Sequence, residues 1–170
     1  MTTDNEVLEK IKDLLYERLE EIKLEKPNED SNEEYELVNP AVYTCWVPPK
    51  NCLHEFGYDI PGIVVCSEDG EDDGDDVNLN IRLNIQTYDP GLTLEDRLLP
   101  NYKGYKDILN LITKIRMILN ENPSEIGIVV EKPIKWGLYD EQLYPYYAGY
   151  MTFKVKMNPL PISQSISKFL

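Results

Sequence analysis

The hydrophobic and polar positions along the chain follow two different periods. Over residues 4–24 apolar side chains recur at spacings of three and four, which predicts an amphipathic helix capped by Thr3 or Asp4. A second stripe of the same period predicts a helix over residues 105–120. We expect the first helix to bury Val7, Leu8, Ile11, Leu14, Leu15, Leu19 and Ile22, and the second to bury Tyr105, Ile108, Leu109, Ile112, Ile115 and Leu119.

Strict alternation predicts strands between and after these helices. In "VNLNIRLNIQT" (77–87) every second residue is apolar, while amides and one arginine occupy the other face. Residues 60–66 are continuously apolar, which is typical of a strand covered on both faces. Further strands are predicted at 41–47, 126–133 and 148–157.

The resulting order of elements is α-β-β-β-α-β-β. Such an order predicts an α+β protein with a single mostly antiparallel sheet and two helices packed on one face. We expect one domain over residues 1–158, with an acidic linker at 25–36 after the first helix and a C-terminal tail at 159–170.

Composition and charge limit the kinds of molecule that the protein is expected to bind. The 170 residues carry a net charge of −14, which disfavours binding to the phosphates of nucleic acids and to anionic membranes. No apolar run approaches the ~20 residues needed to span a bilayer, so no membrane partner is expected. Three cysteines do not suggest a disulfide framework, and a reducing cytoplasm is the expected compartment.

An acidic stretch between two predicted strands, "SEDGEDDGDD" (67–76), partly follows the register of a calcium-binding loop. Its twelfth position is Asn80 instead of a bidentate glutamate, and strands flank it instead of helices. We therefore favour a solvated hairpin turn whose charge opposes aggregation, with weak capture of a divalent ion as the alternative. The residues that match the register are Asp69, Glu71, Asp73, Gly74 and Asp75.

The sequence offers few other candidates for a metal site or a catalytic site. Cys45, Cys52, His54 and Cys66 lack the paired spacing of structural zinc sites. A single histidine excludes sites with several histidines, and the chain has no G-x-S-x-G elbow and no glycine-rich phosphate loop. We expect no enzyme activity, and we assign no catalytic residue, no metal ligand and no cofactor.

Five tyrosines crowd the stretch "YDEQLYPYYAGYMTFKVKM" (139–157). Stacking on nucleic-acid bases normally needs a positive groove, but the nearest charges here are Asp140 and Glu141. Stacking on sugars, a packed corner at the sheet edge and a protein–protein interface all remain open.

The second half of the chain resembles a known family. A helix "GYKDILNLITKIRMIL", a strand, Trp136, "DEQLYPYYAGYMT" and an alternating final strand follow one another as in small tail proteins of long-tailed bacteriophages and prophages, known as tail terminator, tail-completion or neck proteins. The match spans about residues 60–157. It includes the pattern Q-x-Y-P-Y-[WY]-x-G-x-M, formed here by Gln142, Tyr144, Pro145, Tyr146, Tyr147, Gly149 and Met151.

The resemblance implies a structural virion protein. Such proteins form a ring, commonly hexameric, that caps the head-proximal end of the tail tube and offers a docking surface to the head. The implied partners are further copies of this chain, the tail tube protein and a head-closure protein, while DNA passes without being specifically bound. The implied location is the host cytoplasm during assembly and then the virion tail.

Two alternatives accompany this interpretation: a head–tail adaptor or head-closure protein of the same neck region, and a small calcium- or carbohydrate-binding module that uses 67–76 or 139–150. For the assembly role, we expect interface residues in the tyrosine-rich stretch and in the apolar C-terminal tail. They are Trp136, Tyr144, Pro145, Tyr146, Tyr147, Ile162, Ile166 and Phe169.

Overall fold

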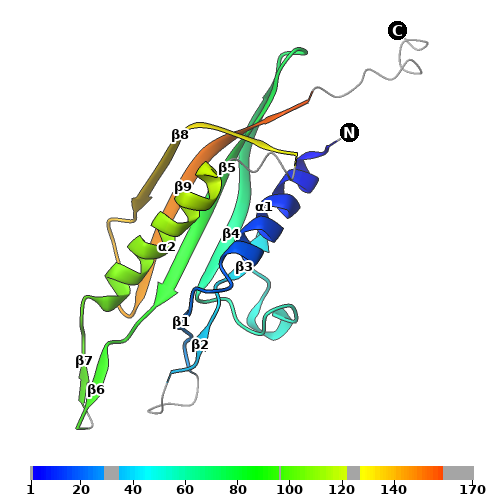
Figure 1. Ribbon diagram of the computed structural model, residues 1–170. Coiled ribbons are helices and arrows are strands. Elements are labelled where there is room, and N and C mark those ends of the chain that lie inside the picture. Colours follow the sequence, from blue (N-terminus) through cyan, green and yellow to red (C-terminus); the bar gives the residue numbers. More distant parts are fainter. Residues whose placement is uncertain (1, 29–34, 96, 122–126, 159–170) are drawn as a thin grey trace.

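The computed structural model describes residues 2–28, 35–95, 97–121 and 127–158 (Figure 1). Two helices and five longer strands appear in the predicted order, and four short strands and a 3-10 turn are added to them. The elements are α1 (Asp4–Arg18), β1 (Leu24–Glu25), β2 (Leu37–Val38), β3 (Ala41–Thr44), the 3-10 turn η1 (Lys50–Cys52), β4 (Gly62–Asp72), β5 (Val77–Tyr88), β6 (Leu92–Leu94), β7 (Arg97–Leu99), α2 (Lys103–Asn120), β8 (Val129–Leu138) and β9 (Tyr146–Met157).

The predicted α+β fold is confirmed. A five-stranded sheet has the order β3-β4-β5-β9-β8, and both helices lie across one of its faces (Figure 1). Strands β4, β5, β9 and β8 pair antiparallel, whereas β3 pairs parallel with β4, from Ala41 opposite Gly62 to Thr44 opposite Val65. The parallel pair requires a crossover, which residues 45–61 supply.

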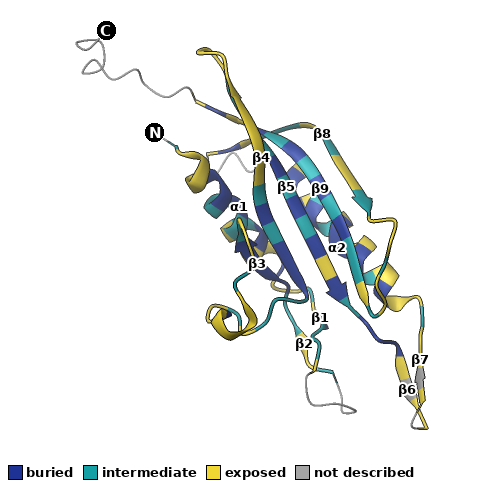
Figure 2. Ribbon diagram, turned by 180° about the vertical axis from the view of Figure 1, so that it is seen from behind, coloured by how far each residue is buried: buried dark blue, intermediate teal, exposed yellow. Residues whose placement is uncertain are grey.

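The core lies between the sheet and the helices. The inward residues of β5 are the alternating apolar ones predicted from the sequence, and those of β9 follow the same period (Figure 2). They pack against α1 and α2 in one cluster, whose fully buried large side chains are Ile11, Leu15, Leu19, Ile63, Ile81, Leu83, Ile85, Ile108, Leu111, Ile112, Ile115 and Leu119.

The first helix is shorter than the sequence pattern predicted. Thr3 is its N-cap, because the Thr3 hydroxyl accepts from the backbone N–H of Glu6 while the Glu6 carboxylate accepts from that of Thr3. The helix ends at Arg18, with Leu19 as its C-cap, so Ile22 lies beyond it.

The buried stripe of α2 is rotated relative to the prediction. Tyr105 and Leu109 were expected inside but are 44% and 38% exposed. Leu111 and Ile118 are buried instead, together with the predicted residues Ile108, Ile112, Ile115 and Leu119. Because α2 carries more apolar residues than one stripe holds, packing against the sheet selects the face.

A second, smaller apolar cluster lies on the opposite face of β3. The crossover 45–61 folds back so that Leu53 and Phe56 pack on Tyr43. The Tyr43 hydroxyl donates to the carbonyl oxygen of Tyr58 at 2.7 Å. The predicted strand 41–47 ends at Thr44, because the next residue, Cys45, has a φ of 66° and leaves the extended conformation.

Two hairpins extend from opposite ends of the sheet (Figures 1 and 2). At one end β4 and β5 continue their pairing to Asp72 opposite Val77, which places the acidic stretch 67–76 in a hairpin, as predicted. At the other end β6 and β7 form a separate two-stranded sheet within a connection that the sequence did not predict to contain strands. We call this β6–β7 hairpin the arm.

Candidate functional site

The tyrosine-rich stretch forms a corner that turns from the end of β8 into β9. The Gln142 side chain holds this turn: its Nε2 donates to the carbonyl oxygens of Tyr139 at 2.6 Å and Ala148 at 2.9 Å, and its Oε1 accepts from the Ala148 N–H at 2.7 Å. One amide side chain thus bonds three backbone groups of the turn, of which the Ala148 carbonyl oxygen also accepts from the Tyr139 N–H at 3.2 Å.

The corner is fastened to the segment that follows β5. The Tyr144 hydroxyl donates a short hydrogen bond to the carbonyl oxygen of Pro90, and the Asp89 N–H donates to the carbonyl oxygen of Pro145 at 3.0 Å. Tyr144 remains 46% exposed. Its ring therefore presents a fixed aromatic surface whose hydroxyl is already paired.

Tyr146 and Tyr147 lie on opposite faces of the sheet. Tyr146 is 40% exposed on the outer face, the face away from the helices, with its ring centroid 5.3 Å from that of Tyr88. Tyr147 points inward and packs against the core, where its ring occupies the space that a Cβ on Gly104 would need. Of the two, Tyr146 is accessible to a partner and Tyr147 is part of the interior.

Trp136 is not part of the same surface as Tyr146. It stands opposite Met151 in the β8–β9 ladder, on the face that carries the helices, and is 44% exposed at the sheet edge. The guanidinium carbon of Arg116, on α2, lies 3.5 Å from the centroid of the Trp136 ring. This cation–π contact joins β8 to α2.

The arm is an apolar surface that the sequence analysis missed. Leu92, Leu94 and Leu99 are 58%, 55% and 47% exposed there, although leucines in a short hairpin are usually covered. At its base the Gly91 φ of 98° permits the turn, and a Cβ on Gly91 would fall 2.1 Å from the carbonyl oxygen of Leu99. The alternation in "GLTL" is its trace in the sequence, but a strand of three residues is too short for alternation to distinguish it from a loop.

The arm and the tyrosine corner are continuous. Pro90, which accepts the Tyr144 hydrogen bond, is followed by Gly91 and then by the first arm residue, Leu92. We call the combination of Leu92, Leu94, Leu99, Tyr144 and Tyr146 the arm–corner surface. It is the candidate functional site for binding another protein, because it gathers exposed apolar and aromatic side chains at one end of the sheet.

A polar network crosses the outer face of the sheet. Arg82 of β5 donates to Glu68 at 2.9 Å, to the Tyr139 hydroxyl at 3.1 Å and to Asn84 at 3.2 Å. Its guanidinium carbon also lies 4.7 Å from the centroid of the Tyr150 ring. The amide-rich face of 77–87 is thus ordered by one arginine that links β4, β5, β9 and the residue after β8.

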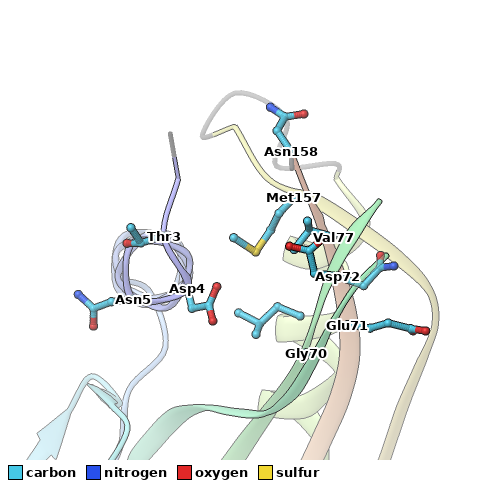
Figure 3. A pocket seen from close by; sticks show the side chains of 11 residues that line it. Thr3, Asp4, Asn5, Gly70, Glu71, Asp72, Val77, Met157 and Asn158 are labelled. Carbon is cyan, nitrogen blue, oxygen red and sulfur yellow. The ribbon is translucent and has the colours of Figure 1, made fainter. Parts of the chain in front are cut away.

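A groove of about 630 Å³ lies between the start of α1 and the part of the β4–β5 hairpin that adjoins its turn (Figure 3). Its apolar lining residues are Val77, Leu79 and Met157. Asp4 and Asp72 are among the acidic residues at its rim (Figure 3). The rim does not suit an anionic ligand, because its charge would repel one.

The acidic hairpin uses its aspartates to build the turn. The Asp72 carboxylate accepts a hydrogen bond from the Gly74 N–H at 2.9 Å. The Asp73 carboxylate accepts from the backbone N–H groups of Asp75 and Asp76 at 3.0 Å and 2.7 Å. These bonds lower the pKa of Asp73. The arrangement is that of a solvated turn, as favoured from the sequence.

The apolar tail residues Ile162, Ile166 and Phe169 lie outside the described part of the chain. None of the described helices is long and apolar enough to cross a membrane. The chain matches no protein-family model and no curated protein sequence. The fold and the arm–corner surface are therefore the structural features that bear on its function.

Proposed function

We propose that the protein is a structural component of virion assembly: a tail terminator that forms a ring on the head-proximal end of a phage tail tube. The observation that carries this proposal is the arm–corner surface, on which three leucines and two tyrosines stand exposed at one end of a well-packed domain. The resemblance of residues 60–157 to phage tail proteins supplies the identity of the assembly.

The arm has the properties of a contact between subunits. In the described part of the chain its leucines are exposed and lie outside the main core cluster, so a neighbouring subunit that covers them would bury apolar area. The arm and the acidic hairpin extend from opposite ends of the sheet (Figure 1). A protomer with different surfaces at its two ends forms heterologous contacts, and such contacts close into a ring when the rotation between subunits permits it.

The charge of the chain suits a channel for DNA. With a net charge of −14 the protein repels phosphate, so DNA passes through the ring without being retained or specifically bound. The partners proposed are further copies of the chain, the tail tube protein and a head-closure protein. The places proposed are the host cytoplasm during assembly and the virion tail afterwards.

The test is association with tail tubes of the cognate phage. Purified full-length protein is mixed with tubes, and ring formation and tube-end binding are followed by native mass spectrometry and negative-stain imaging. We expect rings on the tube ends. A protein that binds neither tube ends nor itself would overturn the proposal, and one that binds only heads would indicate a head-closure protein.

A matched pair of variants assigns the binding to the arm. Leu92→Ser with Leu94→Ser removes apolar side chains from the arm, whereas Leu37→Ser with Leu109→Ser changes two leucines that are also exposed, at 56% and 38%, on other elements. We expect loss of tube-end binding in the arm variant alone, with both variants folded. Equal binding by both variants would exclude the arm as the contact.

A further inference from the structure

Three carboxylates from separate parts of the chain meet beside the first turn of α2. They belong to Glu25 of β1, Asp89 just after β5, and Asp107 of α2, and one oxygen of each lies within 4.8 Å of the others. Their side chains are 12%, 4% and 18% exposed. We call these three residues the carboxylate cluster.

One positive side chain faces the cluster. Lys103 Nζ donates a short hydrogen bond to Glu25 and a second one, of 2.9 Å, to Asp107 Oδ2, and it lies 4.0 Å from Asp89 Oδ2. Three carboxylates thus share one ammonium group. Burial raises the pKa of Asp107, and the charges of Glu25 and Asp89 add to this rise while Lys103 opposes it.

Two buried oxygens of the carboxylate cluster lack a hydrogen-bond donor among the described residues, and this is a second, independent observation. The Oδ1 atom of Asp89 accepts from the Gly91 N–H at 2.7 Å, but Asp89 Oδ2 is buried and has no donor among the described residues. Glu25 Oε2 is also buried, and none of the residues that the structure describes donates to it. Buried carboxylate oxygens are normally paired, so these two acceptors point to a bound group that carries more positive charge than the Lys103 ammonium group and contacts more of the oxygens.

We propose that Glu25, Asp89 and Asp107 bind one hard divalent cation of the Ca²⁺ or Mg²⁺ class, which takes the place of the Lys103 ammonium group. Carboxylate oxygens are the preferred ligands of these ions. Oxygens that bind one Ca²⁺ at about 2.3–2.6 Å lie up to ~5 Å apart, and the cluster meets this limit. The Lys103 side chain is 50% exposed, so it can turn outward into water when the ion enters.

The site is independent of the proposed assembly role, and its position gives it a structural effect. Asp89 accepts from the Gly91 N–H at the base of the arm, and Asp107 belongs to α2, the helix that follows the arm. A cation bound there fixes both ends of the arm's connection to the sheet.

The first experiment measures binding by the full chain in metal-free buffer. Calorimetric titration with CaCl₂, MgCl₂ and MnCl₂ is combined with thermal unfolding at each end point. We expect one ion per chain and a higher melting temperature with at least one of these salts. Neither heat nor a melting shift at millimolar concentrations of all three would overturn the proposal.

A second experiment separates the cluster from the acidic hairpin. Asp89→Asn removes a charge from the cluster, and Asp73→Asn removes the same charge from the exposed hairpin turn. We expect binding to be lost in the first variant and retained in the second. The reverse result would place the ion in the hairpin and overturn the proposal. If Asp89→Asn does not fold, Asp107→Asn gives the same test at the rim of the cluster.

A third experiment uses the lysine as a competitor. Because the ion and the ammonium group compete for the same three carboxylates, Lys103→Gln is expected to bind the ion more tightly, on the order of tenfold. The added ion should also restore the melting temperature that this variant loses. Weaker binding in Lys103→Gln would contradict replacement of the lysine by the ion.

Discussion

Gly104 lies against the ring of Tyr147, so closely that a Cβ atom on the glycine would fall 2.3 Å from Tyr147 Cε2. This contact joins the first turn of α2 to the start of β9, which are more than forty residues apart in the chain. Tyr147 shares the inward-facing period of β9 with Met151 and Phe153, and its contact with Gly104 makes the glycine a requirement of packing.

Gly104→Ala is expected to destabilise the protein by about 1–3 kcal/mol, because the added methyl group overpacks the contact with the Tyr147 ring. In a helix without such a contact the same change stabilises by up to about 1 kcal/mol, so the sign of the effect is diagnostic. Chemical denaturation measures it. Asn110→Ala, on the exposed side of α2, serves as the control and should change stability little.

Tyr146→Ala and Tyr147→Ala should have different consequences. Tyr147→Ala empties a packed position and is expected to cost about 2–4 kcal/mol of unfolding free energy. Tyr146→Ala removes a half-exposed ring paired with Tyr88 and should cost about 1 kcal/mol, while weakening association with the tail tube. Thermal unfolding together with the tube-binding assay separates the two. Equal destabilisation would show that Tyr146 is also a core residue.

Gln142→Ala should loosen the corner. The change removes the Gln142 bonds to the Tyr139 carbonyl oxygen and to the Ala148 N–H, while the Ala148 carbonyl oxygen keeps its bond from the Tyr139 N–H. We expect a loss of about 1–3 kcal/mol of unfolding free energy. Hydrogen exchange of the Ala148 amide should become faster. Glu141→Ala, the exposed neighbour, is the matched control, and a similar effect in both variants would mean that the side-chain bonds of Gln142 do not hold the turn.

Because the Tyr43 hydroxyl is buried, we expect the free energy of unfolding to decrease at alkaline pH. Burial raises the pKa of Tyr43 from 10.0 to about 12, with smaller contributions from Glu55 and Asp59. Between these two values the unfolded chain loses the proton while the folded protein keeps it, so the unfolding free energy falls as the pH rises from about 10 to 12.

Tyr43→Phe removes this titration. We expect a shallower fall of unfolding free energy over the same pH range, together with the loss of the last step in the ultraviolet titration of the tyrosines. An unchanged alkaline profile in Tyr43→Phe would mean that the decline arises from other groups, such as the general repulsion of an acidic chain.

The sequence predicted the sheet best where one face of a strand is buried and the other is exposed to solvent. In β5 the side chains from Leu79 to Ile85 alternate between the core and the outer face. The buried positions require apolar residues and the exposed positions do not, so the sequence alternates with the same period. The stripe of α2 was predicted less well, because Leu109 and Leu111 are equally apolar and only contact with the sheet decides between them.

The arm and the carboxylate cluster could not be found in this way. Strands of three residues in β6 and β7 have no core of their own and leave too short a pattern to read. Glu25, Asp89 and Asp107 are brought together by the pairing of β1 and the placement of α2, and no local spacing relates them. The tyrosine corner was visible as an unusual composition, but which tyrosine faces inward depended on the strand register.

The pairing of β5 with β9 also has a consequence for the order in which the chain folds. This central ladder runs from Val77 opposite Met157 to Tyr88 opposite Tyr146, so its partners are separated by the whole of α2, β8 and the arm. During synthesis β5 can pair with β4 soon after both emerge, but its other edge stays open until the last strand leaves the ribosome. Sheets closed by such distant strands form slowly, since the loop must be ordered first. Until then the exposed edge of β5 is a site at which newly made copies can aggregate.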